Sequence, residues 1–161
     1  SHDMTELPGF IAVETGDDND LPLAIAWALA DGRIKHTLIQ PDDTWLDDEL
    51  NELNGYSLEE LHNFGASPLD VIRELENDHF NATLYTAGIY SDEAALARLF
   101  DTYGIDPFIE LAPADSLYPE LASGDWSRAR SALFGEMGLE PLRPEHEVEV
   151  MLRLHEQLGK V

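Results

Sequence analysis

Short apolar runs separated by turn residues make up the beginning of the sequence. Strands are predicted over residues 9–14 and 23–29, because both runs are short, apolar and bounded by polar or glycine-containing segments. The turn pair Asp31-Gly32 follows the second run, and residues 34–40 then alternate in the manner of a third strand. The pattern therefore predicts a three-stranded, hairpin-like meander.

The rest of the chain alternates between helical and strand patterns. Ser57 and Glu60 form a capping-box signature, and Ser67-Pro68 places an N-cap and a first-turn proline ahead of an amphipathic stretch. Further helices are predicted over residues 45–53, 92–103 and 127–137 and after Pro144, and further strands over residues 82–86 and 108–111. This order predicts an α/β domain with a mixed sheet.

The length of 161 residues fits one domain with a substantial core. Residues 1–3, which precede Met4, are typical of a vector-derived remnant, so the single domain is predicted over residues 4–161. No apolar run approaches the roughly 20 residues of a membrane span, and no secretory segment is present, so no membrane partner is expected. The absence of cysteine fits a cytoplasmic protein.

The charge of the chain is strongly acidic. Thirty-three Asp and Glu residues against nine Lys and Arg residues give a net charge of −24. Proteins that bind polynucleotides neutralise phosphates with basic side chains, so this charge argues against a general polynucleotide binder. It fits a solvated acidic surface, a halophilic source, a basic protein partner or mimicry of nucleic acid.

Three candidate site residues occur at the ends of predicted elements. Glu14 ends the first strand ahead of a glycine turn, Asp92 lies near the start of a helix that follows a strand, and His146 opens the last helix. In this order they resemble the motifs of the DEDDh 3′-5′ exonucleases, whose first motif runs Asp-x-Glu-(Thr/Ala)-(Thr/Ser)-Gly. The resemblance extends over residues 8–158. It implies a ribonuclease H-like α/β fold, with a central mixed β-sheet flanked by helices.

Two positions depart from that resemblance where the family binds metal. Ala12 stands in place of the first Asp, and Met151 stands where the third motif, His-x4-Asp, has its Asp. In the family, four carboxylates hold two divalent ions, Mg²⁺ or Mn²⁺, for phosphodiester hydrolysis. The resemblance implies that Glu14 and Asp92 are the remaining metal ligands and catalytic residues, with His146 as general base. The loss of two ligands predicts impaired catalysis.

Each of these candidates also has a structural interpretation. Glu14 fits an exposed carboxylate that caps a turn. Asp92 fits an acidic residue at a helix N-terminus, where the helix dipole favours negative charge. His146 fits a surface residue at the start of a helix. The sequence leaves both interpretations open for all three.

Other acidic and aromatic residues near these motifs are candidates for related roles. Asp17, Asp18 and Asp20, or Glu147 and Glu149, would be replacement ligands, but we expect the loop to be solvated and the two glutamates to lie off the matching face. Trp126 lies between polar residues, so we expect it to be exposed and able to anchor a partner.

The leading hypothesis is an exonuclease-like domain whose ancestral reaction was metal-dependent hydrolysis at nucleic-acid 3′ ends, and which is now impaired or inactive. An alternative from another class is an acidic protein-interaction module on the same fold, with a basic protein partner. A third hypothesis is an active exonuclease on short oligonucleotides, for which a long basic groove is unnecessary. Many relatives with this fold dimerise, so a homodimer stays open.

Overall fold

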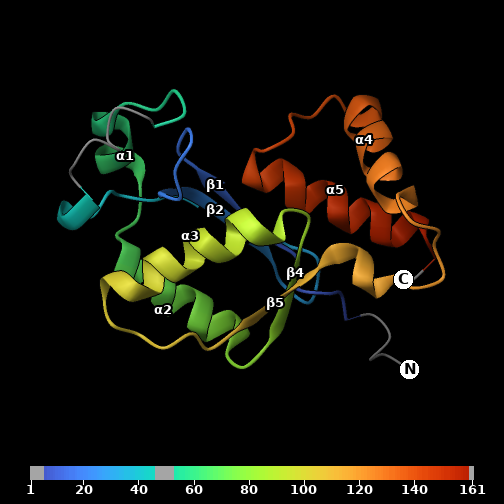
Figure 1. The fold of residues 1–161 in the computed structure, drawn as a ribbon, viewed down its shortest axis with the longest axis horizontal. Helices are drawn as coiled ribbons and strands as arrows, with labels where there is room; N and C mark the ends of the chain where they lie inside the picture. Colours follow the sequence, from blue (N-terminus) through green and yellow to red (C-terminus); the bar gives the residue numbers. More distant parts are fainter. Residues whose placement is uncertain (1–5, 46–52, 160–161) are drawn as a thin grey trace.

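The computed structural model describes residues 6–45 and 53–159, so the predicted remnant at residues 1–3 lies outside the described residues. Over these residues the chain is an α/β protein with five α-helices and two small sheets. The helices are α1 (Leu58–Phe64), α2 (Pro68–His79), α3 (Ile89–Thr102), α4 (Asp125–Met137) and α5 (Pro144–Gln157). Figure 1 shows α1, α2 and α3 on one side of the molecule and α4 and α5 on the other. No helix in the described part of the chain combines the length and apolarity that a membrane crossing needs.

The first sheet is the predicted meander. Its strands β1 (Ile11–Thr15), β2 (Pro22–Ala28) and β3 (Ile34–Leu38) are hydrogen-bonded in the order β1-β2-β3, and both pairs are antiparallel. The ladder between β1 and β2 has an irregularity between Glu14 and Thr15. Such an irregularity bends the end of a strand and can redirect its side chains.

The second sheet continues the first one. Strand β4 (Thr83–Thr86) pairs in parallel with β5 (Glu110–Pro113), and an isolated parallel bridge joins Phe10 to Tyr85. The resulting order is β3-β2-β1-β4-β5, with β2 alone running antiparallel to the other strands. The predicted α/β class is therefore confirmed, and one isolated bridge links the antiparallel sheet to the parallel one, although β5 begins two residues later than predicted.

The helix starts follow the local signals in the sequence. Ser57 caps α1: its hydroxyl oxygen accepts from the Glu60 backbone N–H, and the Glu60 carboxylate accepts from the Ser57 backbone N–H, which confirms the capping box. Helix α3 begins at Ile89, three residues before its predicted start, so Asp92 lies within its first turn. The predicted helix over residues 45–53 lies mostly outside the described residues, and Trp45 ends a short 3₁₀ helix, η2 (Asp43–Trp45).

Alternating side chains of the central strands point into two separate cores. Ile11, Val13, Ile25 and Trp27 belong to a hydrophobic cluster that includes residues of α2 and α3. Phe10, Ala12, Ala26 and Ala28 belong to a second cluster with α4 and α5.

The core beneath α5 is built from small strand residues. Because Ala12, Ala26 and Ala28 have short side chains, α5 can pack closely on β1 and β2. On α5 itself, Val148 and Met151 are almost completely buried, as the predicted apolar stripe requires. The position where the family motif ends in Asp is thus part of a packed core.

Candidate functional site

A pocket of about 370 Å³ lies where the end of β1 meets the first turns of α3, α4 and α5. Three of the carboxylates that line it are buried: Glu14 from β1, Asp92 from α3 and Glu147 from α5. Their exposed fractions are 7%, 4% and 5%. Since a carboxylate loses its hydration on burial, each of the three requires hydrogen-bond donors or a cation from the protein.

Two side chains, those of Asn54 and Tyr56, donate hydrogen bonds to Glu14. The Asn54 amide donates to one carboxylate oxygen at 2.7 Å, and the Tyr56 hydroxyl donates to the other at 2.8 Å. Burial, together with this hydrogen bond, raises the pKa of the Tyr56 hydroxyl well above its ordinary value, so Tyr56 stays a donor. The interpretation of Glu14 as an exposed turn carboxylate is therefore wrong.

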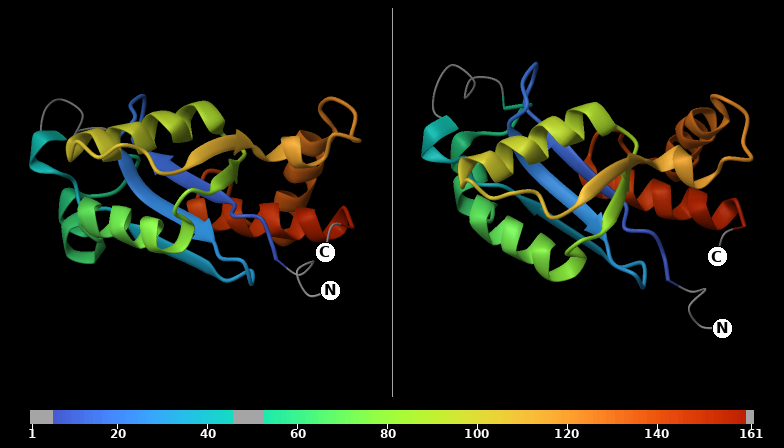
Figure 2. Two further views of the ribbon diagram at one scale, coloured as in Figure 1. Left: turned by 90° about the horizontal axis from the view of Figure 1, so that it is seen from below. Right: turned by 60° about the horizontal axis from the view of Figure 1, so that its bottom comes forward.

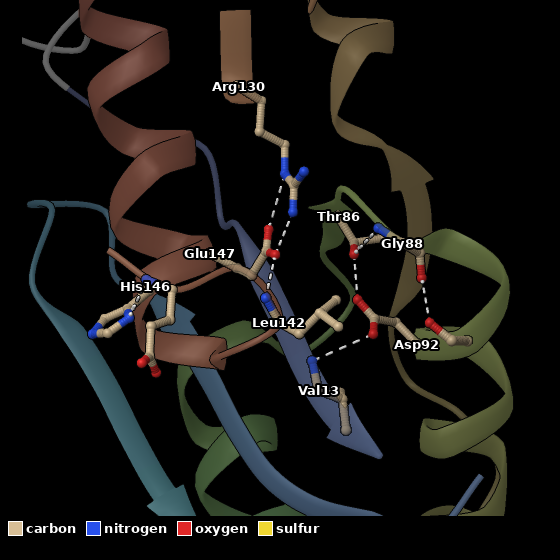
Figure 3. Close-up of polar contacts among 10 residues, drawn as sticks. Val13, Thr86, Gly88, Asp92, Arg130, Leu142, His146 and Glu147 are labelled. Carbon is tan, nitrogen blue, oxygen red and sulfur yellow. Dashed lines mark hydrogen bonds and ion pairs between the residues drawn. The ribbon is translucent and has the colours of Figure 1, made fainter. Parts of the chain in front are cut away.

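Asp92 is held by β1 and by the last residue of β4. One carboxylate oxygen accepts from the Val13 backbone N–H at 3.4 Å, and the other accepts from the Thr86 hydroxyl. Figure 3 shows that the same hydroxyl accepts from the Gly88 N–H, at 3.1 Å. Burial raises the pKa of Asp92 to about 7, although these hydrogen bonds oppose the shift. Asp92 is thus a buried group and not a solvated residue of a helix N-terminus.

Glu147 forms a two-pronged ion pair with Arg130 of α4. The Arg130 Nε donates to one carboxylate oxygen at 3.1 Å, and Nη2 donates to the other. That second oxygen also accepts from the Leu142 N–H at 2.9 Å (Figure 3). The expectation that Glu147 lies off the matching face is wrong, because it lies one helical turn before Met151 and faces the pocket. The four-residue spacing between Glu147 and Met151, about one turn of a helix, is the sequence signal that places both on the same face of α5.

His146 has a different environment from the two other predicted site residues. Its Nδ1 accepts a hydrogen bond from the Glu140 backbone N–H at 3.1 Å, and its ring is directed away from Asp92 (Figure 3). It is not among the described residues that line the pocket. The structure therefore brings Glu14 and Asp92 to one pocket and places His146 outside it.

The two positions at which the family resemblance expects a metal-binding Asp share one environment. Ala12 and Met151 both belong to the hydrophobic cluster between the sheet and α5. Of the loop carboxylates, Asp17 lines the pocket and accepts from the Asn54 backbone N–H at 3.2 Å, whereas Asp20 pairs with Arg98 at 2.6 Å. Apolar packing thus occupies the two positions at which the resemblance expects further ligands.

Trp126 is buried and lines the same pocket. Only 6% of its surface is exposed, so the expectation of an exposed partner anchor is wrong. Helix α4 begins at Asp125 and turns the indole inward against the core beneath α5. The indole Nε1 has no hydrogen-bond acceptor among the described residues. A ligand with an acceptor at this position would supply one.

All six oxygens of the three buried carboxylates accept hydrogen bonds from the protein. Within residues 6–45 and 53–159, no three His, Cys, Asp or Glu side chains converge in a way that could hold a metal ion. Each of these carboxylate oxygens already has a hydrogen-bond donor from the protein, and the Arg130 guanidinium already pairs with Glu147. The donor set does not fit a two-metal site in this arrangement.

The sequence matches no family model, and it matches no curated protein.

The raised pKa of Asp92 predicts a pH-dependent stability. Because the folded protein keeps this carboxyl protonated up to about pH 7 and the unfolded chain releases the proton near its ordinary value of 3.8, the free energy of unfolding should fall as the pH rises between them. The slope due to Asp92 is at most about 1.4 kcal/mol per pH unit. Asp92→Asn should remove this slope when unfolding is measured in urea with EDTA. Parallel pH profiles for both proteins would contradict the assignment.

The Arg130–Glu147 pair predicts a strong non-additive effect. Arg130→Met should lower the free energy of unfolding by about 3–5 kcal/mol, because it leaves Glu147 buried without its cation. Arg130→Met combined with Glu147→Leu should recover most of that loss. Arg128→Met, which removes the exposed pair with Asp125, should cost less than about 1 kcal/mol in the same denaturation measurement. Equal losses for Arg130→Met and Arg128→Met would show that the buried pair has no special role.

Proposed function

We propose that this chain is a DEDDh-exonuclease-type domain of ribonuclease H-like fold that has lost metal-dependent hydrolysis. The mixed strand order β3-β2-β1-β4-β5 supports the fold assignment, as does the delivery of Glu14 and Asp92 to one pocket. Both residues come from the element ends at which the resemblance to this family expects its first and second motifs.

The observation that carries the loss of activity is that both oxygens of each of the three buried pocket carboxylates accept hydrogen bonds from the protein. Arg130 supplies, from within the chain, the positive charge that divalent ions would supply in an active site. A metal ion near Glu147 would have to displace or repel this guanidinium. Ala12 and Met151 add packing instead of ligands, so the pocket is stabilised without metal.

The contacts of the three predicted catalytic residues indicate which roles they have in this proposal. Glu14 and Asp92, the expected ligands of Mg²⁺ or Mn²⁺, now hold β1, α3 and the loop at residues 54–56 together. His146 could act as a general base on a water in the pocket only after leaving the Glu140 N–H. We infer that all three have structural roles.

The test is a nuclease assay with Mg²⁺ and Mn²⁺ on single-stranded DNA, RNA and short oligonucleotides. We expect product formation to stay at the background of Glu14→Gln, because the variant removes a charge that no metal uses. In Glu14→Gln the amide oxygen can still accept from Asn54, and the amide NH2 can donate to the Tyr56 hydroxyl oxygen, so this variant is less disruptive than truncation.

Turnover above that background would contradict the loss of activity. If it occurred on dinucleotides but not on long strands, the chain would be an active exonuclease on short oligonucleotides. If it occurred on both, a metal site would have to be rebuilt around Glu14 and Asp92 by a rearrangement of Arg130.

The pairing of the basic residues favours a second candidate function, an acidic protein-interaction module. Of the eight Lys and Arg residues within residues 6–45 and 53–159, seven pair with carboxylates of the same chain. They are Arg33, Lys35, Arg98, Arg128, Arg130, Arg143 and Arg153. Phosphates would therefore meet few uncommitted cations, whereas a basic protein would meet a large excess of carboxylates.

This second function predicts a basic partner whose binding depends on salt. Capture of proteins from an extract on the immobilised chain should enrich basic proteins at about 50 mM salt and lose most of them at about 500 mM, because salt screens exposed charges. Immobilised bovine serum albumin, another acidic protein, serves as the control surface. Identical captures on both surfaces, or capture that does not change with salt, would contradict the interaction role.

A further inference from the structure

Strand β5 has one edge that no described strand covers. It pairs with β4 along its other edge, where the Glu110 N–H donates to the Ala82 carbonyl at 3.0 Å. Neighbouring residues of a strand direct their backbone groups to opposite sides. The N–H and C=O groups of Leu111 therefore face outward, away from β4. Such groups are a template for one more strand.

An apolar hollow of about 400 Å³ lies beside this edge, between β5 and α3. Its apolar lining is Leu96, Ala97, Phe100, Pro107, Ile109 and Leu111. Figure 2 shows α3 and β5 side by side in both views. The hollow is therefore placed to take an apolar side chain of a segment that pairs with β5.

The apolar surface continues past the end of the hollow. Phe100 contacts Phe108 edge to face, with ring centroids 5.2 Å apart, and Phe108 stacks on Phe80 at 6.1 Å. Phe80 is 59% exposed, although it is a large aromatic residue. A segment lying along β5 could cover this ring as well, so the edge offers more than one apolar contact.

The charge around the hollow favours a basic occupant. Glu93 and Glu110 are exposed and line it, and no Lys or Arg is among its lining residues in the described part of the chain. A second copy of this chain would bring another net charge of −24 to the interface, which opposes self-association. A segment that carries Lys or Arg beside apolar residues matches both the hollow and its rim.

We propose that the outer edge of β5 and the adjoining hollow bind an extended, basic peptide segment of a partner protein. The segment adds a strand to β5 through the backbone of Leu111, places an apolar side chain in the hollow, and sets basic side chains beside Glu93 and Glu110. This inference rests on the proposed interaction role and is independent of the loss of nuclease activity.

The test uses a fluorescein-labelled peptide of alternating Lys and Val, with binding followed by fluorescence anisotropy at about 50 mM salt. Leu111→Pro removes the outward N–H without removing a donor to β4, and it should weaken binding about tenfold. Glu93→Lys with Glu110→Lys should weaken binding at least as much.

The matched control is Glu136→Lys with Glu149→Lys, which makes the same change of charge at exposed sites on α4 and α5 and should have little effect. A Lys and Ser peptide should bind weakly to the unaltered protein, because it has no side chain for the hollow.

Three other outcomes would refute the β5 site or its proposed occupant. If the peptide binds but both pairs of charge reversals weaken it equally, and Leu111→Pro does not, the acidic interaction role stands and the β5 site is refuted. If the peptide does not bind the unaltered protein, the β5 site is refuted as well. If light scattering gives twice the chain mass and Leu111→Pro halves it, the occupant is a second copy and the proposed partner is wrong. Circular dichroism and thermal unfolding show whether each variant is folded.

Discussion

The burial of three carboxylates in a strongly acidic chain is the constraint on which the rest of this site depends. Glu14, Asp92 and Glu147 have lost most of their contact with water, and the chain as a whole carries a net charge of −24. A buried carboxylate can be neutralised by a metal, paired with a cation, hydrogen-bonded or protonated. The pocket uses three of these solutions: a guanidinium for Glu147, neutral donors for Glu14, and a raised pKa with two donors for Asp92.

These solutions also connect the elements around the pocket. The Arg130–Glu147 pair joins α4 to α5, and the bonds of Asp92 join α3 to β1 and to the end of β4. Below them, Ala12 and Met151 belong to the apolar core between the sheet and α5. The two residues that depart from the family pattern therefore contribute to packing. In the proposed history, the pocket exchanged metal binding for internal hydrogen bonds and apolar contacts.

Much of the fold could be predicted from local patterns, because those patterns decide local structure. The short apolar runs of β1 and β2, the capping box at Ser57 and the proline at position 68 all specify their elements through residues that are close in the sequence. The start of α3 was predicted too late, because Gly88 caps this helix with no side-chain hydrogen bond that a sequence motif would reveal.

The pocket was harder to predict, because its partners are far apart in the sequence. Glu14 could be found as a strand-end carboxylate, but its donors Asn54 and Tyr56 lie about forty residues away. The polar neighbours of Trp126 indicated exposure, whereas its packing depends on α5. Glu147 was misplaced for a similar reason, since its partner Arg130 comes from another helix.

The central claim is that the pocket has no place for catalytic metal ions. The most direct measurement is a Mn²⁺ titration followed by electron paramagnetic resonance, which counts bound ions, on the unaltered protein and on Glu14→Gln. Because weak binding to exposed carboxylates should be common to both proteins, the account predicts superimposable titrations. A saturable class of bound Mn²⁺ that disappears in Glu14→Gln would contradict it.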